Sequence, residues 1–472
     1  NNNNNNNNVN NNNNKNNNND NTSNSNDNNN NNKTKNRRAA KTRRTRKTTT
    51  RRRREKLERE AEEDELFRDG GWQPRRLRVQ ANVTRVAGTG RPGWRDGHAA
   101  YAAAFNAPMG IAVGPDGSLY IADGANHRIR RLRRGFVTTV AGSGPCIDFS
   151  RNRVPTGQPR QDGWALEARF DWPTDVAVDP KGNVYIADSH HHAIRKLTPG
   201  GVVTTIAGGT KGLADGHGSR ARFSLPYALD YLPDEDGPGP GSLLITDKHN
   251  ARVAALSLAG PSYEVSTVHL RGLPGMPLPH SVAVDRHGAV GPSSLSLAIG
   301  TESPYSVCVA PMERAEGGRL VVDGSESQTV IGAADIISMD GLVEEHRVRQ
   351  GAHEGPSGGG GNVIEYNLER LDRNGDVKLF APYALASDPR RRLLLLADTR
   401  NNRVVAVFKG KGGKLRAQSV AGGNSLCGYA DGIGSLARFS YPQGICVDVQ
   451  SGALFLSDTV SNRIRRLELG PC

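Results

Sequence analysis

The stretch LYIADGANHRIRRL, residues 119–132, brings together side chains that can do acid–base or metal chemistry. Asp123 offers a carboxylate, His127 offers an imidazole, and three arginines lie within eight positions of the aspartate. The same groups suit another task, because an aspartate at the end of a strand accepts hydrogen bonds from backbone N–H groups of its own turn. A catalytic group is needed once in a molecule, whereas a turn is stabilised wherever it recurs.

The pattern recurs along the chain. Strand-like runs that end in aspartate occur as LYIAD, VYIAD, LLITD, LLLAD and LFLSD, and these aspartates are Asp123, Asp188, Asp247, Asp398 and Asp458. Four of them have an arginine five residues later, namely Arg128, Arg252, Arg403 and Arg463. An acid and a guanidinium that flank one hairpin turn form a charge-assisted pair. We therefore predict an Asp–Arg clasp across these turns and a structural role for the cluster.

Two copies depart from this pattern. The second copy keeps Asp188 but has Ala193 in place of the arginine. The fourth copy has Thr301 and Ser306 in place of both partners. We therefore do not expect the clasp in every copy.

Three consecutive histidines, His190, His191 and His192, occupy the turn of the second copy. Histidine is a common metal ligand, but three in a row cannot all face one ion from a tight turn, so another loop would have to contribute. The alternative is a solvated turn in which His192 bonds to backbone groups. We expect no metal and no cofactor, and we keep these histidines as candidate ligands only. Glycine-rich nucleotide-binding and nucleophile-elbow motifs are also missing from the sequence.

The elements that carry these residues repeat. Each copy opens on a proline-led apolar run, and the prolines at 108, 173, 226, 279, 382 and 442 are spaced by 65, 53, 53, 103 and 60 residues. Short strands at such a period, separated by glycine and proline, indicate β-blades around an axis. We predict an all-β, closed β-propeller over residues 83–472, of six blades, with an irregular insertion around 310–375. The 103-residue interval leaves an alternative with a seventh blade around residues 362–380.

The ends of the repeats indicate how the ring closes. Five copies have a small residue at the centre of the innermost run, as expected where blades converge: Ala112, Ala177, Ala283, Ala386 and Cys446. The last copy lacks a fourth strand, whereas residues 83–90, VTRVAGTG, precede the first copy without a blade of their own. We predict that 83–90 completes the C-terminal blade and so removes two exposed sheet edges.

Charge is distributed unevenly. The first 54 of the 472 residues hold 14 Lys and Arg against two acids, whereas the remainder holds 48 basic and 46 acidic residues. Residues 1–36 are mostly asparagine and have almost nothing apolar to bury, so we predict a disordered tail over residues 1–70. If nucleic acid binds, we expect it at residues 37–54, through phosphate contacts.

The five cysteines lie far apart and form no disulfide framework or zinc ligand set. No apolar stretch approaches the roughly 18 residues that span a bilayer, so we expect no membrane association. We favour an intracellular protein, cytoplasmic or nuclear, because the arginine run also suits a nuclear address.

The repeat P-x-G-I-A-V … G-x-L-Y-I-A-D-x-x-N-H-R-I-R resembles the NHL repeat. The leader V-A-G-x-G … D-G-x-x-x-x-A-R-F-x-x-P is similar to the version in plant, algal and bacterial NHL propellers. The resemblance covers residues 83–472 and weakens between 286 and 380. It implies the propeller fold but no single function, because relatives include protein-binding and RNA-binding propellers, a lyase that cleaves peptidyl-hydroxyglycine, and modules fused to thioredoxin-like domains.

Two loops recur in each copy, the leader before the proline and the hairpin turn after the aspartate, and we expect both on one face of the propeller. The candidate binding residues of that face are His127, Trp172, His191, Tyr227, His249, His280, Tyr383, Tyr441 and Gln443. Four of these directly follow an inner proline near the channel mouth: Tyr227, His280, Tyr383 and Gln443. Aromatic and histidine side chains there suit either recognition or packing.

The sequence favours a non-catalytic scaffold that presents this face to a protein partner. One alternative is a metal-dependent lyase or hydrolase with its site at the channel mouth. A second alternative is RNA binding, mainly through the basic tail.

Overall fold

The computed structural model describes residues 80–144, 159–234, 239–271, 278–286, 290–291, 295–302, 305–315, 319–323, 325, 327–330, 379–410, 413–423 and 427–469. The predicted disordered tail over 1–70 and its basic segment 37–54 lie outside these ranges. Most of the predicted insertion around 310–375 and the alternative seventh blade also lie outside them.

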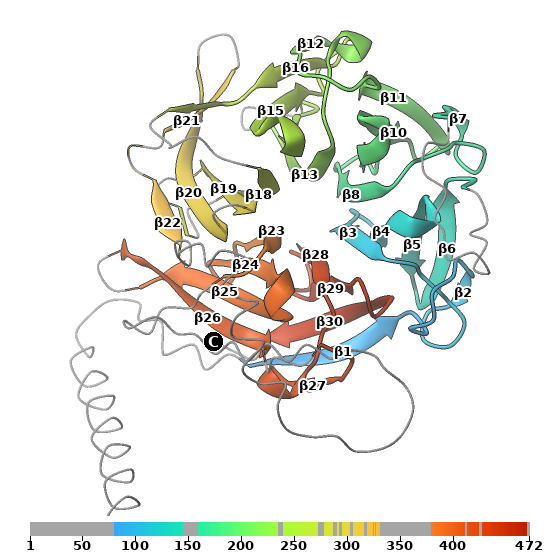
Figure 1. Cartoon of the computed structure of the whole chain (residues 1–472), viewed down its shortest axis with the longest axis vertical. Coiled ribbons are helices and arrows are strands. Elements are labelled where there is room, and N and C mark those ends of the chain that lie inside the picture. Colours follow the sequence, from blue (N-terminus) through green and yellow to red (C-terminus); the bar gives the residue numbers. More distant parts are fainter. Residues whose placement is uncertain are drawn as a thin grey trace, which may run out of the picture. The chain divides into compact units, whose positions relative to one another are not determined.

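The described residues form six β-sheets around a common centre, which confirms the predicted all-β, six-bladed propeller (Figure 1). We number the blades from the first complete sheet along the chain. The innermost strands of blades 1 to 6 are β3 (Pro108–Val113), β8 (Pro173–Val178), β13 (Pro226–Leu232), β18 (Pro279–Arg286), β23 (Pro382–Asp388) and β28 (Pro442–Val447). Each begins at its proline, as the repeat predicts, because proline tolerates the first position of a strand.

The next two strands of each blade pair antiparallel, in sequence order. The second strands are β4 (Leu119–Asp123), β9 (Val184–Asp188), β14 (Ser242–Asp247), β19 (Leu295–Glu302), β24 (Leu393–Asp398) and β29 (Leu454–Asp458). The third strands are β5 (Arg128–Arg133), β10 (Ala193–Leu197), β15 (Arg252–Ser257), β20 (Tyr305–Arg314), β25 (Arg403–Lys409) and β30 (Arg463–Leu469).

The outer strands differ more between blades. The fourth strands are β6 (Phe136–Ala141), β11 (Val202–Gly208), β16 (Glu264–Thr267), β21 (Leu320–Asp323), β26 (Leu415–Gly422) and β1 (Ala81–Ala87). Two-residue strands from the leaders cover four of these edges: β2 (Gly97–His98), β7 (Gly163–Trp164), β12 (Gly216–His217) and β27 (Gly432–Ile433). In blade 4, β17 (His269–Arg271) instead runs parallel to β21, and β22 (Gln328–Val330) pairs with β20.

Blade 6 is built from both ends of the propeller sequence. Strand β1 runs antiparallel to β30, with Ala81 opposite Leu469 and Thr84 opposite Arg466. The strand predicted at 83–90 spans 81–87 in the structure. On the other side of blade 6, the Thr459 hydroxyl donates to the Pro108 carbonyl of blade 1 at 2.7 Å.

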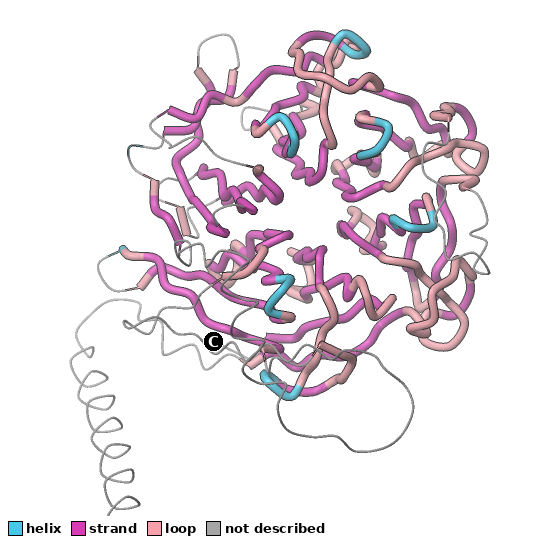
Figure 2. Tube along the Cα trace, in the orientation of Figure 1, coloured by secondary structure: helices cyan, strands magenta, loops and turns pink. Residues whose placement is uncertain are grey.

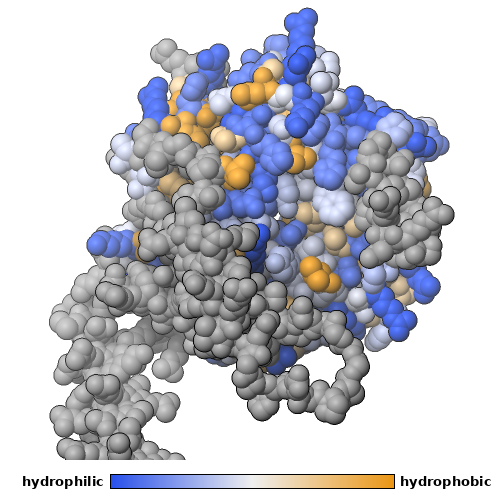
Figure 3. All heavy atoms as spheres, viewed as in Figure 1, coloured by the Kyte–Doolittle hydropathy of each residue, from blue (hydrophilic) through white to orange (hydrophobic). Residues whose placement is uncertain are grey.

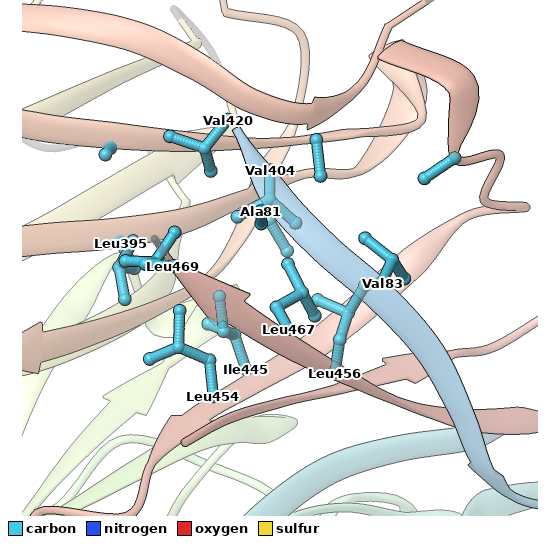
Figure 4. Packing of buried hydrophobic residues seen from close by; sticks show 14 of the residues in the cluster. Ala81, Val83, Leu395, Val404, Val420, Ile445, Leu454, Leu456, Leu467 and Leu469 are labelled. Carbon is cyan, nitrogen blue, oxygen red and sulfur yellow. The ribbon is translucent and has the colours of Figure 1, made fainter. Parts of the chain in front are cut away.

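The hydrophobic core lies between neighbouring blades. Between blades 5 and 6, buried Ala81 of β1 packs in one cluster with Leu395 and Leu456 (Figure 4). Leu394 and Leu396 belong to the cluster on the opposite side of blade 5, because successive side chains of a strand point to opposite faces. This alternation explains why the run LLLLA is apolar without interruption: both faces of an inner strand are buried.

A short 3-10 turn follows the second strand in four blades: η1 (Gly124–Asn126), η2 (Ser189–His191), η4 (Lys248–Asn250) and η7 (Thr399–Asn401). These turns appear as cyan segments within the blades in Figure 2. Two others, η3 (Gly218–Arg220) and η9 (Gly434–Leu436), lie in the leaders of blades 3 and 6. The described residues contain no α-helix, and none of their helices is long and apolar enough to cross a membrane.

Candidate functional site

A fully buried aspartate ends the second strand in five blades, namely Asp123, Asp188, Asp247, Asp398 and Asp458. Its Oδ1 accepts the backbone N–H of the residue two positions before the inner proline, as from Asn106 to Asp123 at 2.8 Å. Its Oδ2 faces an arginine. Burial raises the pKa of Asp123, and the charge of Arg130 opposes that rise. The aspartate therefore ties the leader to the hairpin of the same blade.

The predicted arginine partner was wrong in blade 1 and in blade 6. Arg130 Nη1 lies 2.7 Å from Asp123 Oδ2, so the partner follows the aspartate by seven residues rather than five. The same spacing gives the pairs Asp188–Arg195 and Asp458–Arg465, at 2.7 and 2.9 Å. Blade 2 therefore has an Asp–Arg clasp, although Ala193 occupies the position five residues after Asp188 where an arginine was predicted to be needed.

The predicted spacing of five holds in blades 3 and 5. There Arg252 and Arg403 use their Nε atoms, at 2.8 Å from Asp247 and 2.7 Å from Asp398. The seventh position is occupied by Ala254 in blade 3 and by Val405 in blade 5. The arginine five residues after the aspartate thus pairs with it only where the residue seven positions after the aspartate is not an arginine.

Arg128 and Arg463 have other partners. Arg128 donates to the Asn126 carbonyl at 2.9 Å and lies 4.8 Å from the ring centre of Trp94. Arg463 donates to the Ser461 carbonyl at 2.9 Å and lies 3.8 Å from the ring centre of Tyr429. Each side chain therefore contacts a carbonyl of its own hairpin turn and a ring of the leader, and does not pair with the strand-end carboxylate.

The clasp arginine also reaches the Asp-Gly turn of the leader. Arg130 Nη2 lies 2.8 Å from Asp96, and its guanidinium covers the buried Phe105 ring at 5.2 Å. The same arrangement recurs in three other blades as Arg195–Asp162–Phe170, Arg252–Asp215–Phe223 and Arg465–Asp431–Phe439. Fourfold recurrence of an Asp–Arg–Asp bridge over a phenylalanine identifies it as part of the scaffold. In blade 4 the Thr301 and Ser306 hydroxyls lie 2.9 Å apart instead.

A second recurrent contact joins neighbouring blades and includes His127. In four blades the residue before the third strand has a left-handed backbone and accepts the N–H of the residue before the next blade's inner proline. His127 Nδ1 accepts from Trp172 at 3.1 Å, and His192 Nδ1 accepts from Leu225 at 3.2 Å. Asn402 and Asn462 make the same contact through Oδ1 at 2.9 Å. We call these contacts the blade latches.

The three consecutive histidines have separate contacts. His190 stacks on Trp172 at 5.9 Å, His191 lies 2.8 Å from Asp188, and His192 serves as a latch. Among the residues that the structure describes, no three His, Cys, Asp or Glu side chains form a group that could hold a metal ion. The candidate metal ligands therefore do not converge on one point.

Three predicted face residues do converge, at the positions that follow the inner prolines of blades 3, 4 and 5. The ring of His280 stacks on Tyr383 at 3.7 Å with an interplanar angle of 8°, and lies 4.0 Å from the ring of Tyr227. His280 is buried, and burial lowers its pKa well below the ordinary value, which keeps the ring neutral at pH 7. We call Tyr227, His280 and Tyr383 the aromatic rim.

Charged side chains surround the aromatic rim. Glu302 accepts from the Tyr383 hydroxyl at 3.1 Å and pairs with Lys248 at 2.7 Å. The Lys248 ammonium lies 5.2 Å from the ring centre of Tyr227. Arg400 donates to the Tyr305 hydroxyl at 3.1 Å. The contacts of Glu302 and Arg400 cross the boundaries between blades 3, 4 and 5.

The aromatic rim borders the central channel, a cavity of ≈ 380 Å³ between the innermost strands. Tyr227, Tyr383 and Gln443 line it, and so do two carboxylates, Asp175 and Asp230. Hydrophilic residues cover most of the described part of the face seen in Figure 3, and hydrophobic residues form small separate groups there.

The other predicted face residues lie apart from the rim. His127 and Trp172 meet at 6.5 Å between blades 1 and 2. His191 is held by Asp188, His249 is exposed, and Tyr441 is 41% exposed. The nine candidates therefore do not form one continuous surface.

Five residues around the channel were not predicted from the sequence: Asp175, Asp230, Lys248, Glu302 and Arg400. A usable signal existed for Asp230, because it occupies the central position at which the other five copies have alanine or cysteine. The remaining four residues follow no recurrent pattern that would separate them from ordinary surface charges.

Comparison with known proteins agrees with the fold. The sequence profile of the NHL repeat matches residues 105–132 and 170–197, the segments that carry the clasps of blades 1 and 2. An auxiliary nutrient binding protein from Bacteroides thetaiotaomicron has a similar structure, with a TM-score of 0.53 over 84% of this chain and 78% of that chain. At 15% identity this similarity shows the fold alone.

Two curated relatives have significant sequence similarity. The chain is 32% identical over 202 residues to the Arabidopsis thaliana protein SUPPRESSOR OF QUENCHING 1, chloroplastic, which covers 41% of this chain and 18% of the relative. It is 27% identical over 380 residues to NHL repeat-containing protein 2 of Gallus gallus, which covers 77% of this chain and 46% of the relative. The chain thus spans less than half the length of either relative.

Proposed function

The chain belongs to the NHL-repeat family, and from this premise we propose that it is a non-catalytic propeller that binds a protein partner at the mouth of its channel. The partner contacts the aromatic rim and the charged residues around it. This surface lies on the face that carries the leaders and the hairpin turns.

The observation that carries the proposal is the asymmetry of the rim. Blades 3, 4 and 5 have Tyr227, His280 and Tyr383 after the inner proline, whereas the other three blades have Gln443, Met109 and Thr174. Blades 6, 1 and 2 pack without aromatic residues at this position, so the scaffold does not require them. Clustered tyrosines beside charged side chains are typical of residues that dominate protein interfaces.

The roles of the acidic groups support binding rather than acid–base chemistry. The strand-end aspartates are held by an arginine and a backbone N–H in all five blades that have them. A general acid or base needs access to a substrate proton. Buried carboxylates that recur with the same partners stabilise the blades instead.

Selection of peptides from a random display library on the full chain tests the proposal. We expect selected peptides to lose at least about tenfold in affinity when Tyr227 and Tyr383 are both changed to alanine, because interface aromatic residues contribute most of the binding energy. The matched control is Trp164→Ala, which removes an aromatic side chain that is 64% exposed on the outer strand β7.

Affinity should be measured by titration calorimetry, with circular dichroism as the check on folding. Peptides that bind the double variant as well as the parent, but lose affinity for Trp164→Ala, would contradict the proposed site.

A further inference from the structure

Two carboxylates lie in the channel at positions where the repeat has small residues. Asp230 is at the centre of its inner strand, where the other blades have Ala112, Ala177, Ala283, Ala386 and Cys446. Asp175 is two residues after its proline, where the other blades have Gly110, Ala228, Ser281, Ala384 and Gly444. Both aspartates line the cavity and come from adjacent blades. At each of the two positions the other five blades have no carboxylate, so the repeat itself does not require one there.

The two carboxylates are fixed by backbone donors only in part. Asp175 accepts the N–H groups of Val176 and Leu229, each at 2.8 Å. Asp230 accepts those of Tyr231 at 2.8 Å and Val284 at 2.7 Å. An ionised carboxylate has about four acceptor sites, so these bonds use only about half of the sites on each side chain.

One further acceptor at this end of the channel lacks a donor. Among the described residues, Gln443 Oε1 is buried without a hydrogen-bond partner. His280 is 1% exposed and lies between the two rim tyrosines, and Gln443 lines the cavity. Arg286 is the one cationic side chain among the residues that line the described cavity, and its positive charge lowers the pKa of Asp230, whereas no cationic side chain contributes to the pKa of Asp175. A ligand that fits this environment brings hydrogen-bond donors and positive charge.

We propose that the channel binds a protonated amine, whose ammonium group lies between Asp175 and Asp230 and whose alkyl stem passes Tyr227 and Tyr383. An ammonium has three donors and no acceptor, which matches a site that has acceptors in excess. Tyrosine faces attract cations, and Lys248 already places its ammonium beside Tyr227 and Glu302. A cavity of ≈ 380 Å³ is large enough for a short alkylamine.

The amine is either a free small molecule or the lysine side chain of a partner. The second source rests on the proposed function, since the partner then inserts a side chain through the aromatic rim. The two sources share one recognition chemistry and are separated by the test.

Titration calorimetry of the full chain with n-butylamine tests the site. We expect measurable binding of n-butylamine, none of n-butanol at the same concentration, and about a tenfold or greater loss of affinity in Asp230→Ala. The fold should tolerate this change, because five other blades have alanine or cysteine at the position. The variant Asp230→Asn keeps an acceptor for the Val284 N–H, and its affinity for n-butylamine should fall by a similar factor. The control Glu264→Gln removes one exposed charge from the outer strand β16 and should have no effect.

The second arm uses a lysine-containing peptide selected on the parent chain and its norleucine counterpart. Loss of binding on replacement of lysine, together with loss in Asp230→Ala, assigns the site to a partner's side chain. Binding of n-butylamine without any dependence of the peptides on lysine assigns it to a free amine.

Equal binding of n-butanol and n-butylamine would overturn the inference. So would a folded Asp230→Ala variant that binds n-butylamine and the lysine-containing peptide as tightly as the parent does. Peptides that depend on Tyr227 and Tyr383 but not on lysine would still leave the proposed scaffold function standing.

Discussion

Blade 1 and blade 4 share the same order of inner strands but end their second strands with different chemistry. In blade 1, Asp123 and Arg130 form a buried pair that also holds the leader through Asp96. In blade 4, Thr301 meets Ser306, and the next residue, Glu302, turns to Lys248 and Tyr383 instead. In blade 1, which has the strand-end aspartate and its arginine, these side chains stabilise the blade. In blade 4, which has neither, the end of the second strand contributes Glu302 to the channel mouth.

The largest effect is expected from a substitution that removes the Asp–Arg clasp of blade 1. Arg130→Met should lower the free energy of unfolding by roughly 3–5 kcal/mol, because it leaves the fully buried Asp123 carboxylate without its counter-ion. In blade 4, Ser306→Ala should cost about 1 kcal/mol, since it removes one hydrogen bond between neutral hydroxyls. Urea unfolding followed by circular dichroism measures both. Equal losses in the two variants would show that the blades do not differ in the way we describe.

A smaller effect concerns the pH dependence of amine binding. Burial raises the pKa of Asp175 to about 7, and the groups that face it are Asp230, Tyr227 and Cys446. Because the ionised form binds a cation, affinity for n-butylamine should rise roughly tenfold between pH 6 and pH 8. Calorimetry at the two pH values measures this change, and an affinity that falls as pH rises would contradict it.

The smallest effect concerns the latch of blade 1. Burial lowers the pKa of His127; Asp171 and Asp188 oppose that shift, whereas His190 and Arg128 add to it. A lowered pKa means that the unfolded chain takes up the proton first, so this stabilisation is complete above about pH 6.5 and declines as pH falls below it.

His127→Asn keeps an acceptor of the kind used in blades 5 and 6 but does not titrate. Between pH 7.5 and pH 5.5 the free energy of unfolding should therefore fall by about 1 kcal/mol less in this variant than in the parent chain. His249→Asn, at an exposed turn position, is the control. An unchanged pH dependence in His127→Asn would show that the latch does not titrate in this range.

Much of the architecture was predictable from local patterns. The prolines mark the inner strands, the strand-end aspartates mark the hairpin turns, and the run near residue 83 forms the outer part of blade 6. The choice between Arg128 and Arg130 was not predictable. Both residues are buried on one strand beside Asp123, and the leader, whose Arg95 carbonyl accepts from Arg130, decides which guanidinium pairs with the carboxylate.

The candidate site was predictable only in part. The aromatic residues after the inner prolines were identified, but His127 belongs to a latch whose donor, Trp172, is 45 residues away in sequence. Asp175 and Asp230 were not identified: Asp230 stands out from the small residues of the other copies, but the sequence does not say whether either carboxylate faces the channel or solvent.

The sequence by itself determined the repeating unit, the strands that begin at the inner prolines and the type of turn, since these depend on residues close together along the chain. The tertiary structure alone decided which charges are paired and which remain available in the channel. The physical reason is that burial and pairing depend on contacts between separate blades, such as the hydrogen bond from Ser457 to the Met109 carbonyl, 348 residues apart. No local pattern encodes those contacts.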